Sequence, residues 1–216
     1  MHILDAITER RSARAFLDKP VERETLEKLL SLATQAPSAI NIQPWEIVVV
    51  SGEERKRLSR MLVKRMKERN ISCGPGGTKP LPKQFVERQR GLLQGMLPNL
   101  PPGTEFQDFI NEGSCDFYGA PTAIILTIDQ VHSKARLTDI GIVLGYLVLA
   151  AHGLGLDTCP IGLITAFEDD IREELSLSED KDVVVGMAVG YKDLDAPVNR
   201  ARSERAPLKE VVKWRE

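Results

Sequence analysis

Residues 140–156, IGIVLGYLVLAAHGLGL, contain no Asp, Glu, Lys or Arg, and they constrain the fold more than any other segment. A stretch this apolar either crosses a membrane or is buried inside protein. His152, four glycines and the polar sequence on both sides favour a helix that is buried on all sides in a soluble protein. Gly141 and Gly145 have the GxxxG spacing that lets a second helix approach closely. Such a helix is also typical of a subunit interface.

Three short β-branched runs, WEIVVV, TAIILTI and DVVVGMAVG, predict strands at 46–50, 122–128 and 183–190. A shorter strand is expected near 157–160. Apolar residues at helical spacing, with good helix formers between them, predict helices. These helices are expected over 3–10, 22–35, 53–69, 83–96, 136–153 and 167–175. Few strands, many helices and no regular βαβ repeat indicate an α+β fold.

Residues 70–120 stand out as an irregular insertion within one expected domain, 1–216. CGPGGTKPLP and LPNLPPG bracket the helix predicted near 83–96, and they make this stretch irregular on either side. Phe106 and Phe109 follow the second of these. A flexible insertion with apolar side chains suits a lid over an organic substrate. A surface excursion with its own small core explains the same pattern equally well.

Charge and cysteine content exclude several classes of protein. The formal net charge is -2, so the chain has no global field that would attract nucleic acid or an anionic membrane. Cys73, Cys115 and Cys159 are odd in number and widely spaced, which argues against a disulfide framework and offers no CxxC pair to a metal. No apolar run of signal-peptide length precedes the first charges. We expect a cytoplasmic protein with no metal, nucleic-acid or membrane partner.

The stretch ERRSARAF, 9–16, concentrates Arg10, Arg11, Ser12 and Arg14 on an acidic chain. Three guanidiniums repel one another, so an anion would favour their convergence. From this stretch alone, the solvated end of a first helix is an equal alternative. No strand runs into GxGxxG and GxxxxGK[ST] is absent, so a Rossmann turn and a P-loop are not available for a phosphate.

A second polar stretch, APSAINIQPWEIVVV at 36–50, contains a loop between a helix and a strand. Ser38, Asn41 and Gln43 offer hydrogen-bonding groups in this loop. Amides both donate and accept, as the edge of a heterocyclic ring requires. A plain turn would use similar residues.

These two stretches, together with LGYLVLAAHGLGLDTCPIG and RSERAPLKEVVKW, occur in the order found in the nitroreductase superfamily. The chain resembles this FMN-dependent family over nearly its full length. The resemblance implies an α+β nitroreductase-like fold, with a central mixed or antiparallel sheet surrounded by helices. It also implies an intertwined homodimer with two FMN molecules at the subunit interface, each reduced by NADH or NADPH before an organic acceptor takes the electrons in a ping-pong cycle.

The resemblance also assigns site residues. Residues that match the FMN phosphate motif are Arg10, Arg11, Ser12, Arg14 and, near the C-terminus, Arg205. Residues that match the loop reaching the cofactor from the other subunit are Pro37, Ser38, Ala39, Asn41 and Gln43. Residues that match the strand end facing the flavin ring are Pro160, Ile161 and Gly162. Many relatives have a second basic residue two positions before the C-terminal arginine, where this chain has Ser203, with Arg202 one position earlier.

An FMN phosphate carries close to two negative charges, which guanidinium groups and a serine hydroxyl are suited to bind. Arg14 is the candidate for a positive group near N1 and O2 of the ring, where it would stabilise reduced flavin. Because hydride transfer takes place at the flavin, no side chain is assigned as a catalytic residue.

The leading interpretation is an oxidoreductase of the nitroreductase type that reduces a small aromatic acceptor, either a nitroaromatic or a quinone. Alternatives with the same fold are a dehalogenase, an ene reductase or a flavin-fragmenting enzyme. A flavin-binding protein without turnover is an alternative of another class. A nucleic-acid module is a poor interpretation, because three arginines supply too few phosphate contacts.

Overall fold

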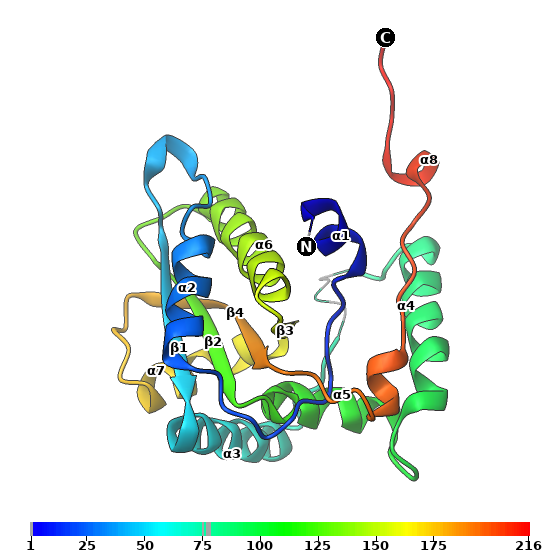
Figure 1. Ribbon diagram of the computed structural model, residues 1–216, viewed down its shortest axis with the longest axis horizontal. Helices are drawn as coiled ribbons and strands as arrows, with labels where there is room; N and C mark the ends of the chain where they lie inside the picture. The colour runs from blue at the N-terminus through cyan, green and yellow to red at the C-terminus, as the bar shows by residue number, and fades with distance from the viewer. Residues whose placement is uncertain (1, 75, 77–78) are drawn as a thin grey trace.

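The computed structural model describes residues 2–74, 76 and 79–216. Its centre is one antiparallel sheet with the strand order β1-β2-β4-β3 (Figure 1). The strands are β1 (Trp45–Ser51), β2 (Thr122–Asp129), β3 (Asp157–Ile161) and β4 (Lys181–Gly190). Their positions follow the β-branched runs of the sequence, and the expected α+β class with helices around a central sheet is confirmed.

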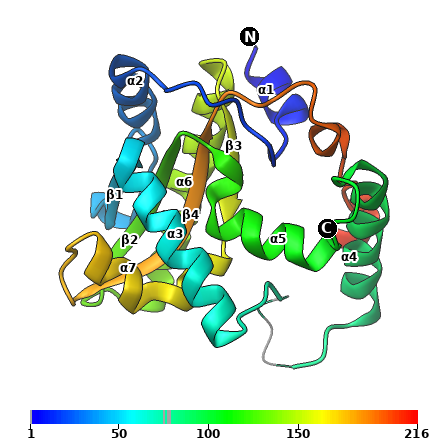
Figure 2. The ribbon, with the colours of Figure 1, turned by 90° about the horizontal axis from the view of Figure 1, so that it is seen from below.

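Helices cover both faces of this sheet (Figure 2). On one face lie α2 (Arg23–Ala33) and α6 (Leu137–Gly153), which bury Leu29 and Leu147 beside Ile124 of β2. On the other face lie α3 (Gly52–Arg69) and α7 (Glu168–Glu174), which pack with Ile125. Because successive residues of β2 enter opposite cores, residues 123–126 of this central strand are all apolar rather than alternating.

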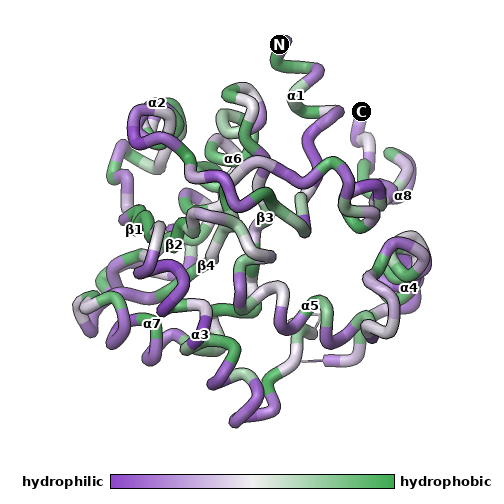
Figure 3. Tube along the Cα trace, turned by 60° about the horizontal axis from the view of Figure 1, so that its bottom comes forward, coloured by the Kyte–Doolittle hydropathy of each residue, from purple (hydrophilic) through white to green (hydrophobic). Residues whose placement is uncertain are grey.

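The remaining helices are α1 (Ile3–Glu9), α4 (Lys83–Met96), α5 (Phe106–Cys115) and α8 (Leu208–Val211). The C-terminal segment runs beside α4, where Arg88 and Glu210 form an ion pair at 3.2 Å (Figure 1). Helix α1 projects from the sheet with Ile3, Leu4 and Ile7 more than half exposed. Figure 3 shows hydrophobic residues interspersed with hydrophilic ones along this helix.

Helix α5 is absent from the sequence-based expectation, which treated this part of the insertion as irregular. Its sequence, FQDFINEGSC, contains residues with low helix propensity, but Asn111, Ser114 and Cys115 are buried by tertiary packing. Gly113 is required by a close approach, because a Cβ at this position would lie 2.5 Å from the ring of Tyr118. The second half of the insertion is thus part of the core rather than a separate excursion.

Helix α6 is not buried on all sides in one chain, so that expectation is wrong. Ile140, Val143 and Leu147 face the sheet, whereas Tyr146 is 41% exposed. In the part of the chain that the structure describes, one helical stretch, Lys134–Gly153, is long enough and apolar enough to cross a membrane. Only 33% of its most apolar 18-residue segment is buried in the protein. A Cβ at Gly141 or Gly145 would meet nothing within 4 Å. The side of α6 that carries the GxxxG spacing is therefore open.

Candidate functional site

The ERRSARAF segment runs along the sheet beside edge strand β3. Ser12 forms a parallel bridge with Thr158, and the N–H of Ala13 donates to the Thr158 carbonyl at 3.0 Å. Farther along, the N–H of Leu17 donates to the carbonyl of Tyr191 at 2.9 Å. These contacts place the arginine-rich segment next to the CPIG stretch, although they are nearly 150 positions apart in the chain.

Asn199 fixes this segment from the C-terminal side. Its Oδ1 accepts from the N–H of Arg14 at 2.8 Å, and its Nδ2 donates to the carbonyls of Ala15 and Asp193, each at 2.8 Å. All three contacts use backbone groups, so they hold the path of the segment rather than any side chain. Sequence reasoning missed Asn199, because a single Asn in a loop carries no local pattern.

The residues predicted for the phosphate end of the cofactor converge on one small cavity of about 40 Å³. Arg10, Arg11, Ser12, Arg14 and Arg205 all line it. The other lining residues are Leu92, Met96, Ala201 and Ser203, so α4 of the insertion forms one wall. No Asp or Glu is among the lining residues.

The arginines of this cavity lack anionic partners. Within the described residues, no carboxylate forms an ion pair with Arg10, Arg11, Arg14 or Arg205. Burial, followed by the charges of Arg205 and Arg11, holds the pKa of Arg10 below its usual value. The Nε atoms of Arg11 and Arg14 are buried, and neither has a hydrogen-bond partner among the residues that the structure describes. Arg10, Arg11 and Arg14 are partly buried and Arg205 is exposed, so the cluster is open to an anion such as a phosphate from solution.

Two of these arginines also make contacts within the chain. The Nη1 of Arg11 donates to the carbonyls of Thr8 and Arg10, at 2.6 and 2.8 Å, and so caps the C-terminal end of α1. Arg205 donates to the Ser203 hydroxyl at 2.9 Å. Arg11 therefore has a structural role beside its predicted one, while Ser203 orients Arg205.

The end of β3 forms the second part of the site. Ile161 is buried, and Gly162 is exposed immediately after it. Gly162 has φ -83°, and a Cβ there would meet nothing within 4 Å, so neither the backbone nor a neighbour in this chain requires glycine. Beside Ser12 and these residues lies Cys159, whose pKa is raised by burial. The open backbone at Gly162 is suited to contact with a flat group.

The loop 37–43 does not join this cluster within one chain. It connects α2 to β1 and lies on the opposite side of α6 from α1 (Figure 1). Ile40, Asn41 and Gln43 have positive φ values of 45°, 60° and 51°. The Ser38 hydroxyl accepts from the N–H of Gln43 at 2.9 Å. The predicted residues Pro37, Ser38, Ala39, Asn41 and Gln43 thus form an ordered loop away from the arginines.

Asp139, a residue that sequence reasoning did not assign to the site, fixes this loop. Its carboxylate is buried at the start of α6 and accepts from the N–H of Ala39 at 3.3 Å. Arg136 donates to its other oxygen at 3.2 Å. The only local signal was an acidic residue at the start of an apolar helix, and its loop partner is 100 positions away.

A larger cavity, of about 730 Å³, lies against the other wall of the segment. Its lining includes Arg14, Phe16, Phe109 and Tyr118. Four carboxylates of the insertion also line it: Glu105, Asp108, Glu112 and Asp116. Burial raises the pKa of Tyr118 to about 12, and its hydroxyl lies 3.3 Å from that of Ser114. An aromatic lining next to Arg14 is suited to a flat organic molecule.

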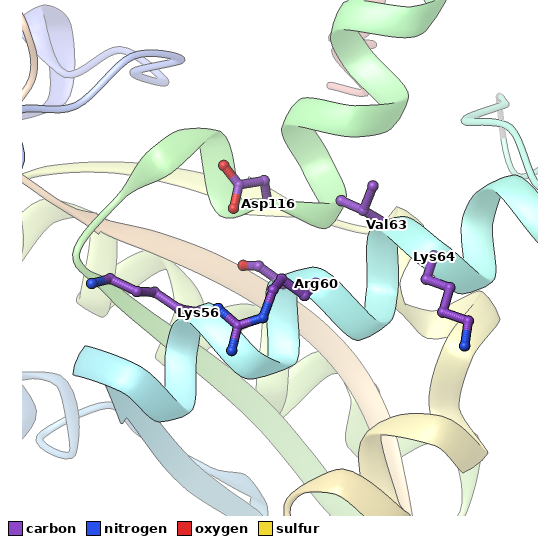
Figure 4. A pocket seen from close by; sticks show the side chains of 6 residues that line it. Lys56, Arg60, Val63, Lys64 and Asp116 are labelled. Atoms are coloured by element: carbon purple, nitrogen blue, oxygen red, sulfur yellow. The ribbon is translucent and has the colours of Figure 1, made fainter.

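Figure 4 shows a different basic groove, of about 420 Å³, along α3. Lys56, Arg60 and Lys64 are spaced four residues apart on one side of this helix. Lys56 pairs with Glu53 at 2.9 Å, and Lys64 pairs with Glu68 at 3.8 Å. These pairs within the helix are typical of a solvated face, and the groove shares no residue with the arginine cavity.

Comparison with known proteins places this geometry in context. The model of the "Nitroreductase family" matches residues 7–191. The chain is 34% identical to a chloronitrobenzene nitroreductase of Comamonas testosteroni, covering 96% of this chain and 94% of that protein. It is 33% identical to a 4-nitrobenzoate reductase of Pseudomonas putida, covering 92% and 89%. The crystal structure of the FMN-dependent nitroreductase NfnB from Mycobacterium smegmatis in complex with NADPH superposes with a TM-score of 0.87 at 32% identity, covering 99% of this chain and 97% of that one.

Proposed function

Because the chain belongs to the nitroreductase family, we propose that it is an FMN-dependent oxidoreductase that uses NADH or NADPH to reduce nitroaromatic acceptors. The observation that carries this proposal is the cavity in which Arg10, Arg11, Arg14 and Arg205 converge without a carboxylate. Four guanidinium groups around a small cavity supply more positive charge than a phosphate dianion needs, and each can donate hydrogen bonds to phosphate oxygens.

The residues present fit an FMN molecule. Arg10, Ser12 and Arg205 would hold its phosphate, and the backbone at Ile161 and Gly162 would face its ring. When bound, FMN would supply hydride transfer between the nicotinamide and the acceptor. Arg14 lies between the phosphate cavity and the aromatic cavity. With FMN bound, the guanidinium of Arg14 would provide a positive charge near the ring and would stabilise the anionic reduced flavin.

The aromatic cavity would receive the acceptor. Phe16, Phe109 and Tyr118 supply apolar surface, and the Tyr118 hydroxyl, whose pKa burial raises, can donate a hydrogen bond at neutral pH. Helix α5 contributes much of this wall, in keeping with a role for the insertion, about 70–120, in covering the substrate. Nitroaromatics and quinones are both flat enough for such a site.

We propose a cytoplasmic homodimer in which α6 packs against a second copy. The open face at Gly141 and Gly145 and the exposed apolar side chains of α1 supply the surface. The loop 37–43 would then approach the cofactor of the partner subunit. Gly145→Leu should shift the protein toward a monomer in sedimentation experiments and lower its flavin content, whereas an unchanged dimer would argue against this interface.

Product analysis tests the proposed reaction. The purified protein is incubated with NADPH in four separate reactions. These contain a nitroaromatic, a quinone, a halophenol, or FMN with no other acceptor. We expect reduced nitro products, with the halophenol and FMN unchanged. Dehalogenation or loss of flavin without nitro reduction would assign one of the other reactions of the fold.

A further inference from the structure

A second basic cavity, of about 430 Å³, adjoins the phosphate cavity and shares Arg11 and Ser12 with it. Its cations are Arg11, Lys192, Arg200 and Arg202, and its carboxylates are Glu9 and Asp157. This volume falls within the range of ligand-binding pockets, whereas the phosphate cavity has room for little more than one small group.

The segment 201–205 divides its side chains between the two cavities. Ala201, Ser203 and Arg205 line the phosphate cavity, while Arg202 lines the second one together with Arg200. Side chains alternate in this way along an extended backbone. Arg202 is therefore not a displaced substitute for a phosphate ligand at position 203, because it faces a different cavity.

The two arginines of the second cavity are available to a ligand. In the described parts of the chain, neither Arg200 nor Arg202 forms an ion pair, whereas Lys192 pairs with Asp157 at 3.1 Å. Asn199, immediately before Arg200, is held by three hydrogen bonds to the backbone. Arg200 thus follows a fixed residue in the chain, and the side chains of Arg200 and Arg202 are both exposed to an incoming anion.

We propose that this second cavity binds the 2′-phosphate of NADPH through Arg200 and Arg202, and that it thereby sets the preference for NADPH over NADH. The inference rests on the proposed use of a pyridine nucleotide at the adjoining flavin site. A 2′-phosphate on the adenosine ribose is usually bound by arginine, because the planar guanidinium donates two parallel hydrogen bonds to phosphate oxygens. The groove on α3 is a weaker candidate, because two of its three cations are paired on their own helix (Figure 4).

The first experiment measures steady-state oxidation of NADPH and NADH by the flavin-loaded enzyme. In R200A/R202A, KM for NADPH should rise by about tenfold or more while KM for NADH and FMN content stay unchanged. Arg202→Lys should retain part of the NADPH preference, because it keeps the charge but not the bidentate geometry. Arg60→Ala, in the α3 groove, is the matched control and should leave both KM values unchanged. Equal changes for both nucleotides, or an NADPH effect in Arg60→Ala alone, would overturn the proposal.

The second experiment does not depend on turnover. Calorimetry measures binding of 2′,5′-ADP, with 5′-AMP as the ligand that lacks the 2′-phosphate. Wild type should bind 2′,5′-ADP more tightly than 5′-AMP, and R200A/R202A should lose that difference. If the flavin-loaded enzyme is active but binds 2′,5′-ADP and 5′-AMP equally well, the proposed 2′-phosphate site is wrong and the proposed function stands. A protein that binds 2′,5′-ADP in this way but neither holds FMN nor oxidises NADPH would overturn the proposed function alone.

Discussion

The side-chain oxygen of Asn199 accepts a hydrogen bond at 2.8 Å from the backbone N–H of Arg14, a residue 185 positions earlier in the chain. The same amide donates to the carbonyl of Ala15. One side chain thus ties the arginine-rich segment to the C-terminal segment that supplies Arg205. This contact positions the two segments that line the arginine cavity.

Asn199→Ala should therefore weaken both stability and cofactor binding. Removal of three hydrogen bonds leaves the N–H of Arg14 unpaired, whereas the Ala15 carbonyl still accepts from the N–H of Asp193, and should lower the free energy of unfolding by about 2 to 3 kcal/mol. Asn199→Asp keeps the acceptor for Arg14 but loses both donors. Chemical denaturation and FMN titration of both variants check this, and wild-type values in Asn199→Ala would contradict the positioning role.

Arg10→Ala should separate stability from binding. The pKa of Arg10 is held down by burial and by the charges of Arg205 and Arg11, so its removal relieves repulsion in the flavin-free protein. FMN affinity should nevertheless fall by about 2 kcal/mol, or roughly thirtyfold, because a charged hydrogen-bond partner is lost. The measurements are thermal unfolding of the flavin-free protein and FMN titration. Arg205→Ala should behave similarly, and unchanged affinity in both variants would remove these arginines from the site.

Gly162→Ala should affect the cofactor far more than the fold. Apart from its chain neighbours, no described residue lies within 4 Å of the added Cβ, so unfolding should stay close to wild type while FMN affinity falls. Gly186→Ala provides the contrast, because its Cβ would lie 2.5 Å from Ile164 in the core. That variant should lose stability. Unchanged FMN binding in Gly162→Ala would show that this backbone does not face the flavin.

Thiol labelling should distinguish Cys73 from the other two cysteines. Burial raises the pKa of Cys115 to about 12 and also raises that of Cys159, while Cys73 is exposed. The pKa of Cys73 is itself raised by desolvation, so its thiolate fraction and labelling rate should increase as pH rises above neutrality. Quantification with a disulfide reagent should give one fast thiol in the native protein and three in denaturant. Fast native labelling of Cys159 would contradict its burial.

The regular elements could be predicted because their signals are local. The strand at Trp45–Ser51 and the helix at Lys83–Met96 follow directly from β-branched runs and helical spacing. Helix α5 could not be predicted, because its low propensity is overcome by burial of Asn111 and Cys115 and by the approach of Tyr118 to Gly113. The partial exposure of α6 was also not predictable, since an all-round apolar sequence does not reveal which side another chain would cover.

In the candidate site, too, residues with a local sequence signal could be predicted and residues placed by distant contacts could not. Arg10 and Arg205 could be assigned from motifs, and the structure brings them to one cavity. Asn199 and Asp139 could not be assigned from motifs. Each accepts a hydrogen bond from a backbone N–H more than 90 positions away in the chain. The sequence shows that Arg202 is charged but not which cavity its side chain lines. That depends on the extended backbone of 201–205, which no local pattern specifies.

The central claim is that the arginine cavity holds the phosphate of an FMN that a pyridine nucleotide reduces. The most direct measurement is the visible spectrum of the purified protein, recorded anaerobically before and after addition of NADPH. The account expects flavin bands equivalent to roughly one FMN per chain, and their bleaching on addition of NADPH. A protein that stays colourless after reconstitution with FMN would contradict the cofactor site, and bound flavin that neither NADPH nor NADH bleaches would contradict the enzymatic role.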